Sequence, residues 1–166
     1  LRTSSAASDV YKRQILGILA VLSGFYTLYK YRVISYEVSS GKLYILVTLL
    51  VAGSALGIYN QGGFGVAHIL GVLTLIALAG GYFMERYKWF GSFSKYFQAL
   101  GYTSTLLFHM IPAITDFLRR LPVGDTFIDS FEDPLLLNFH LSFLIIYLVG
   151  IIAQMIWLRR QASLST

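Results

Sequence analysis

The sequence predicts an all-α protein, a polytopic transmembrane helix bundle of about five spans. Two properties of its composition predict this class: 56% of the 166 residues are hydrophobic, and only 13% are charged. An average soluble domain is about 25% charged, so a soluble globular enzyme and a disordered segment are both excluded. The third observation is that five apolar segments recur along the chain. They lack the strict alternation of apolar and polar residues that membrane-spanning strands show, which leaves helices.

Each apolar segment is close to the roughly 20 residues that a helix needs to cross a bilayer. The expected helices cover residues 15–31, 43–59, 66–83, 97–117 and 135–158. The first is short for a span. The connection at residues 60–65 is uncharged and rich in glycine, which is typical of a tight turn. Asp133 followed by Pro134 predicts the N-cap and the first residue of the last helix.

We expect three parts in the chain. Residues 15–158 form a single transmembrane helix-bundle domain, and residues 159–166 form a cytoplasmic tail. Residues 1–14 are polar, and the stretch SSAASDVYKRQ within them resembles a translated library adapter. We therefore expect a non-native, adapter-derived tail that does not take part in the fold; the alternative is a genuine polar N-terminal tail. The absence of cysteine excludes disulfides, iron–sulfur clusters and thiolate zinc sites.

The distribution of basic residues predicts the orientation in the membrane. Two of the expected loops, together with the C-terminus, contain Lys30, Arg32, Lys42, Arg86, Lys88, Lys95, Arg159 and Arg160. When the bases of the expected adapter tail at residues 1–14 are left out, the opposite side has Arg119 and Arg120 alone, in a loop that also holds four acidic residues. By the positive-inside rule the C-terminus is cytoplasmic, and with five spans the N-terminus lies outside. We expect a multi-pass protein of a bacterial inner (plasma) membrane, with the lipid bilayer and no nucleic acid as its partner.

Three histidines are the main candidates for a functional site, because ionisable side chains at membrane depth are costly. His68, His109 and His140 all fall within expected spans, and the helical rise places them roughly 5–15 Å from the outer boundary. Two polar stripes accompany them. Helical spacing puts Tyr102, Thr105, His109, Pro112 and Asp116 on one face of the fourth helix, and His140, Tyr147 and Gln154 on one face of the fifth. We expect both stripes to face the interior of the bundle.

The histidines are open to three interpretations. Two of them on facing helices could be axial ligands of haem b. Alternatively, His68, His109 and His140 could bind a divalent metal together with Asp116, since imidazole and carboxylate suit zinc, iron or copper. In the third interpretation each histidine is hydrogen-bonded to a neighbouring side chain or carbonyl and has a structural role. In either ligand-binding case, the supporting polar residues would be Tyr102, Thr105, Tyr147 and Gln154.

The order of the segments resembles an uncharacterised family of bacterial membrane proteins, the DUF2306-like family. The stretches that carry the resemblance are LAVLSGFYTLYK, GKLYILVTLLVAGSALGIY and GVAHILGVLTLIAL, and together it covers most of residues 15–158. In that family the first hairpin commonly reads His-Arg before a Gly-x-x-Tyr/Phe motif. Here Ser39 and Ser40 precede Gly41, so no role of that histidine can be carried over. The resemblance implies a membrane helix bundle and no particular activity.

Two classes of function follow from these observations. The leading hypothesis is a small redox or haem- or metal-binding membrane protein, with a quinone or a larger membrane complex as its partner. The alternative is a non-enzymatic transport or assembly subunit whose histidines are structural or relay protons. No nucleophile and base occur at a plausible spacing, so we assign no catalytic residue and leave open whether the protein is an enzyme.

Overall fold

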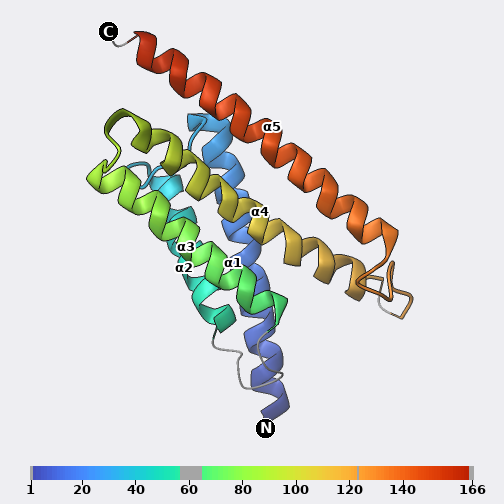
Figure 1. Ribbon diagram of the computed structural model, residues 1–166. Helices are drawn as coiled ribbons and strands as arrows, with labels where there is room; N and C mark the ends of the chain where they lie inside the picture. The colour runs from blue at the N-terminus through green and yellow to red at the C-terminus, as the bar shows by residue number, and fades with distance from the viewer. Residues whose placement is uncertain (1, 57–64, 123, 165–166) are drawn as a thin grey trace.

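The structure is a computed structural model that describes residues 2–56, 65–122 and 124–164. Within these residues all regular secondary structure is helical, which confirms the predicted all-α bundle (Figure 1). The elements are α1 (Arg2–Tyr31), α2 (Ser39–Leu56), α3 (Val66–Tyr87), the short 3-10 helix η2 (Gly91–Phe93), α4 (Ser94–Arg120) and α5 (Pro134–Leu164). The glycine-rich turn expected at residues 60–65 lies outside the described residues, apart from Gly65.

All five expected helices form, and each extends beyond its apolar run on at least one side. The largest difference is in α1, which begins at Arg2 instead of residue 15. Residues 2–14 contain neither proline nor glycine, and Ala, Lys, Arg and Gln among them favour helix. The start of α5 is as predicted: the Leu135 amide donates to Asp133 Oδ1 at 2.8 Å, which satisfies one of the free amides at the helix start.

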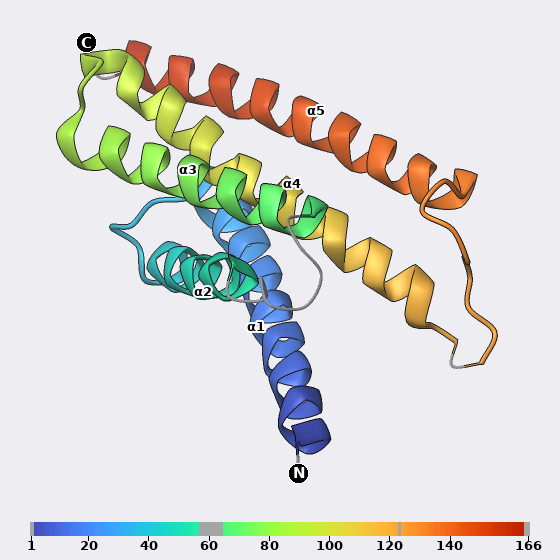
Figure 2. The same ribbon diagram turned by 60° about the horizontal axis from the view of Figure 1, so that its bottom comes forward.

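Helix α4 is the centre of the bundle. It packs against α1, α3 and α5, and Figure 1 shows it lying between α3 and α5. Figure 2 shows α1 and α2 on the side of the bundle away from α5. Helix α5 therefore has α4 as its main neighbour, and it runs antiparallel to it.

Helices α3 and α4 approach each other closely through glycine. A Cβ at Gly101 of α4 would lie 2.8 Å from the carbonyl oxygen of Ala77 and 3.1 Å from the Cα of Gly81. Both of these atoms belong to the backbone of α3, so no side-chain movement could make room. Small residues of this kind allow helices in a membrane to pack at short distance.

Three helical segments are long and apolar enough to cross a membrane: Ser39–Leu56, His68–Tyr87 and Pro134–Leu164. The apolar part of α1, Ile15–Tyr31, is shorter. Only 11% of the most apolar window of α5 is buried inside the bundle, so its apolar side chains need an apolar solvent. Helix α4 is more polar than these segments. It can still lie in a membrane, because several of its polar side chains are buried against other helices. Length, composition and exposed apolar surface together define a membrane protein in a lipid bilayer.

Candidate functional site

The polar face of α4 is buried where α4 crosses α2. The side chains of Tyr102 and Thr105 are fully buried, and His109 is 8% exposed. The Thr105 hydroxyl shares a hydrogen bond with the Tyr44 hydroxyl of α2. One turn further along both helices, His109 Nε2 lies 3.2 Å from Thr48 Oγ1. Two polar pairs, one helical turn apart, thus attach α4 to α2.

The polar stripe of α4 does not stay in the interior along its whole length, and the expectation for Asp116 is wrong. The Asp116 side chain is 55% exposed and pairs with Arg120 of its own helix, with 3.4 Å between Oδ2 and Nη2. Figure 2 shows the reason: the C-terminal part of α4 extends past the end of α3. Among the described residues, the helical face that is buried at His109 is therefore exposed at Asp116.

The stripe of α5 faces α4 along its whole length. The three side chains, seven residues apart, each reach a hydroxyl group of α4. Thr103 Oγ1 donates to Gln154 Oε1 at 3.0 Å, the hydroxyls of Tyr147 and Ser104 are 2.7 Å apart, and His140 Nε2 lies 3.3 Å from Thr115 Oγ1. Hydrogen bonds of this kind between membrane helices contribute about 0.6 kcal/mol each on average, so the three together hold α5 in register on α4.

The third histidine lies at the start of α3. The Gly65 amide donates to His68 Nδ1 at 3.2 Å, and the His68 amide donates to the Gly65 carbonyl at 3.0 Å. Both bonds satisfy backbone groups at the end of a helix, where partners within the helix are missing. His68 therefore helps to cap its own helix.

The three histidines do not form one site. His109 is directed at α2, whereas His140 meets α4 at Thr115. Thr115 is six residues beyond His109, which corresponds to about 9 Å along the helix axis and to a different face of α4. Within the described ranges, no group of three or more His, Asp and Glu side chains could hold a metal ion. The hypothesis of a metal site made by the three histidines with Asp116 therefore has no supporting geometry.

A carboxylate that the sequence did not single out, that of Glu85 near the end of α3, accepts several hydrogen bonds from other parts of the described chain. It accepts hydrogen bonds from the Tyr102 hydroxyl at 2.9 Å and from the Ser35 hydroxyl at 2.5 Å. It also accepts the Tyr36 amide, which lies 2.9 Å from Oε1 and 3.0 Å from Oε2. One carboxylate thus connects α3, α4 and the segment between α1 and α2.

That segment is held by further contacts close to Glu85. The Ile34 side chain is fully buried, and its carbonyl oxygen accepts a hydrogen bond from Gln98 Nε2 of α4 at 3.1 Å. A signal for Glu85 was present in the sequence: on the strongly basic side of the protein, the only acidic residues are Glu37 and Glu85. Each of these two carboxylates is a candidate for a specific partner because it lies among cations.

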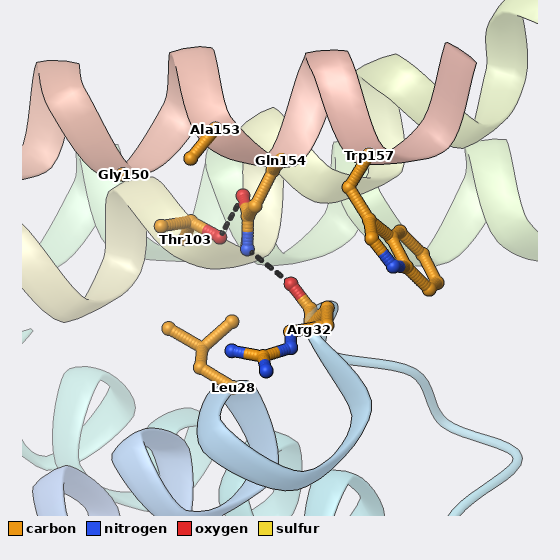
Figure 3. A pocket seen from close by; sticks show the side chains of 7 residues that line it. All are labelled: Leu28, Arg32, Thr103, Gly150, Ala153, Gln154 and Trp157. Carbon is orange, nitrogen blue, oxygen red and sulfur yellow. Dashed lines mark hydrogen bonds between the residues drawn. The ribbon is translucent and has the colours of Figure 1, made fainter. Parts of the chain in front are cut away.

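A groove of about 500 Å³ lies between α1, α4 and α5, at the end where basic residues gather. Its lining residues, shown in Figure 3, are Leu28, Arg32, Thr103, Gly150, Ala153, Gln154 and Trp157. The Gln154 side chain lines the groove and is fixed by two hydrogen bonds. Its Nε2 donates to the backbone carbonyl of Arg32 at 2.9 Å, and its Oε1 accepts from Thr103. The Gln154 side-chain amide thus links α5 to the residue that follows α1.

No protein-family model, no curated protein and no solved structure matches the chain. The resemblance to the DUF2306-like family stays a prediction.

Proposed function

We propose that this chain is a non-enzymatic membrane protein that acts as a subunit in transport or in the assembly of a larger membrane complex. Its histidines hold its helices in place. The observation that carries the proposal is the separation of the three imidazoles. His109 bonds to Thr48, His140 bonds to Thr115, and His68 bonds to the backbone at the start of its own helix.

The physical argument concerns the ring nitrogens. A histidine that ligates a metal or haem iron gives one ring nitrogen to the metal and uses the other for an orienting hydrogen bond. In His109 and His140 the engaged nitrogen is Nε2, through which histidine usually binds haem iron, and it already faces a threonine hydroxyl. The polar groups of α4 and α5 are likewise used between helices, which is the role expected of a scaffold.

We place this subunit in a bacterial inner membrane with five spans, α1 to α5. The basic residues that end α1, α3 and α5 then lie on the cytoplasmic side together with the C-terminus, as the positive-inside rule requires. Helix α4 is 27 residues long, or about 40 Å by the helical rise, which is enough to cross the bilayer with its polar face covered.

The test replaces all three histidines by glutamine in the full chain. Glutamine keeps the capacity to bond to a threonine hydroxyl, but it is not a usual ligand of haem or of zinc, iron and copper. Purified wild-type protein is expected to show no Soret band and less than one metal ion per chain. The triple variant is expected to keep the thermal stability of the wild type to within about 1 kcal/mol, and any transport activity in proteoliposomes should survive.

A Soret band or a stoichiometric metal in the wild type that disappears in the triple variant would overturn the proposal. That result would restore the redox hypothesis, with a quinone or a redox complex as the partner. Loss of flux in a variant that still folds would instead assign the histidines to proton transfer.

A further inference from the structure

The groove between α1, α4 and α5 has the chemistry of a lipid site. One end is apolar, with Leu28 of α1 facing Gly150 and Ala153 of α5. Gly150 leaves open space, since a Cβ there would meet no atom within 4 Å. The groove is also lined by the Arg32 guanidinium, which Figure 3 shows below the Gln154 amide and turned toward Leu28, and by the Trp157 indole on the other side of the Arg32 backbone.

Arg32 has no carboxylate partner within the part of the chain that the structure describes. Among the described residues, the only ion pair joins Asp116 to Arg120, so no carboxylate of these residues neutralises Arg32. The other polar groups that line the groove are engaged: Thr103 donates to Gln154 Oε1, and Gln154 Nε2 donates to the Arg32 carbonyl. The guanidinium therefore has five donors available for an anion from outside the chain.

The groove also has the right orientation relative to the membrane. Leu28 precedes Arg32 by one turn of α1, and Gly150 precedes Trp157 by about two turns of α5. Figure 1 shows that α1 and α5 run toward the same end of the bundle. The apolar end of the groove is thus deeper in the bilayer, whereas Arg32 and Trp157 lie where the aromatic and basic residues of a membrane protein meet the headgroups.

We propose that this groove binds an anionic phospholipid, with the headgroup phosphate on Arg32 and an acyl chain over Gly150 and Ala153. Basic pockets between membrane helices on the cytoplasmic side are suited to such headgroups. The Arg32 guanidinium supplies paired hydrogen bonds to phosphate oxygens, and the missing side chain at Gly150 supplies room for the chain. The proposal does not depend on the histidines.

The experiment uses the full chain in a non-ionic detergent and three probes: short-chain phosphatidylglycerol, phosphatidylcholine with the same chains, and inorganic phosphate. Binding is followed by native mass spectrometry and by the rise in the thermal unfolding midpoint. Phosphatidylglycerol is expected to bind saturably, and more tightly than either other probe. Arg32→Gln should weaken this binding about tenfold, as expected for the loss of a charged hydrogen-bond pair.

Two further variants make the result specific. Arg160→Gln removes an exposed cation near the same end of the bundle without touching the groove, and it should weaken binding clearly less than Arg32→Gln. Gly150→Leu fills the apolar end, and it should weaken phosphatidylglycerol binding while Arg32 stays in place. The hydrogen bond from the Gln154 side chain goes to the backbone carbonyl of Arg32 and does not involve the Arg32 side chain, so we expect Arg32→Gln to keep the fold.

Each alternative result overturns the proposal. Equal losses in Arg32→Gln and Arg160→Gln would mean general attraction to a basic surface. Equal binding of phosphatidylcholine would mean an apolar groove without headgroup recognition. Equal stabilisation by inorganic phosphate would mean a simple anion site, and unchanged binding in Gly150→Leu would mean that no acyl chain enters the groove.

Discussion

The Tyr102 hydroxyl of α4 donates a hydrogen bond to the Glu85 carboxylate of α3 at 2.9 Å. The Tyr102 ring lies directly over Gly81, where a Cβ would come within 2.7 Å of Tyr102 Cδ1. The absence of a side chain at Gly81 therefore brings the tyrosine within reach of a carboxylate one turn further along α3. Because Glu85 also binds Ser35 and the Tyr36 amide, this contact joins three parts of the chain.

Removing the Tyr102 hydroxyl should destabilise the bundle more than removing that of Tyr147. Tyr102→Phe keeps the ring but loses a hydrogen bond to a charged group, for which we expect a loss of about 1.5 kcal/mol. Tyr147→Phe loses a bond to the neutral Ser104 hydroxyl and should cost about 0.6 kcal/mol. Unfolding in mixed detergent–SDS micelles measures both. Equal losses would mean that the Glu85 contact is not special.

The glycines of α3 and α4 provide a matched pair for the close approach of these helices. Gly101→Ala should cost about 1–3 kcal/mol, because its Cβ would meet backbone atoms of Ala77 and Gly81. Gly80→Ala adds a Cβ where no atom lies within 4 Å, and it should be neutral or stabilising by up to about 1 kcal/mol. Thermal unfolding of the two variants gives the comparison. A harmless Gly101→Ala would contradict the packing of α3 on α4.

Helices α2 and α3 should be linked by an engineered disulfide. A Cβ at Gly71 would lie 3.6 Å from the Cβ of Ala55, which is within the range that disulfides require. The chain has no cysteine of its own, so Ala55→Cys with Gly71→Cys can form only this bond within a chain. Mild oxidation should make free thiols disappear without forming dimers on a gel. Ala55→Cys paired with Gly80→Cys is the control and should keep its thiols.

The proposed topology can be tested by thiol labelling. Ser92 and Asp129 are both exposed, and five spans place them on opposite sides of the membrane. In intact cells a membrane-impermeant maleimide should label Asp129→Cys but should label Ser92→Cys only after lysis. The cysteine-free wild type gives the background. The reverse pattern would invert the orientation, and labelling of both in intact cells would exclude an odd number of spans between them.

Periodicity in the sequence predicted which faces of the helices are polar, but not how far the neighbouring helices extend. The spacing of His140, Tyr147 and Gln154 led to the correct face of α5, because α4 lies beside that helix throughout. The same reasoning failed at Asp116, which lies on the polar face of α4 but beyond the end of α3. Residue spacing within one helix does not show where the adjacent helix ends, because that depends on the tertiary structure.

The connections of Glu85 could not be predicted for a related reason. Its partners Ser35 and Tyr36 precede it by about fifty residues, and Tyr102 follows it on another helix. No local motif relates these positions. The histidines illustrate the converse: the sequence predicted a common depth for them, but a common depth does not determine whether imidazoles on different helices point toward one another.

The one-sided attachment of α5 has a consequence for how the chain is assembled during synthesis. Helices α1 to α4 contact one another before α5 is needed, and the Glu85 contacts lie entirely among them. We therefore expect α1 to α4 to assemble in the bilayer first, and α5 to join them when its three polar side chains bond to the hydroxyls of α4. For the same reason, we expect α5 to be the helix whose detachment disturbs the contacts among α1 to α4 least.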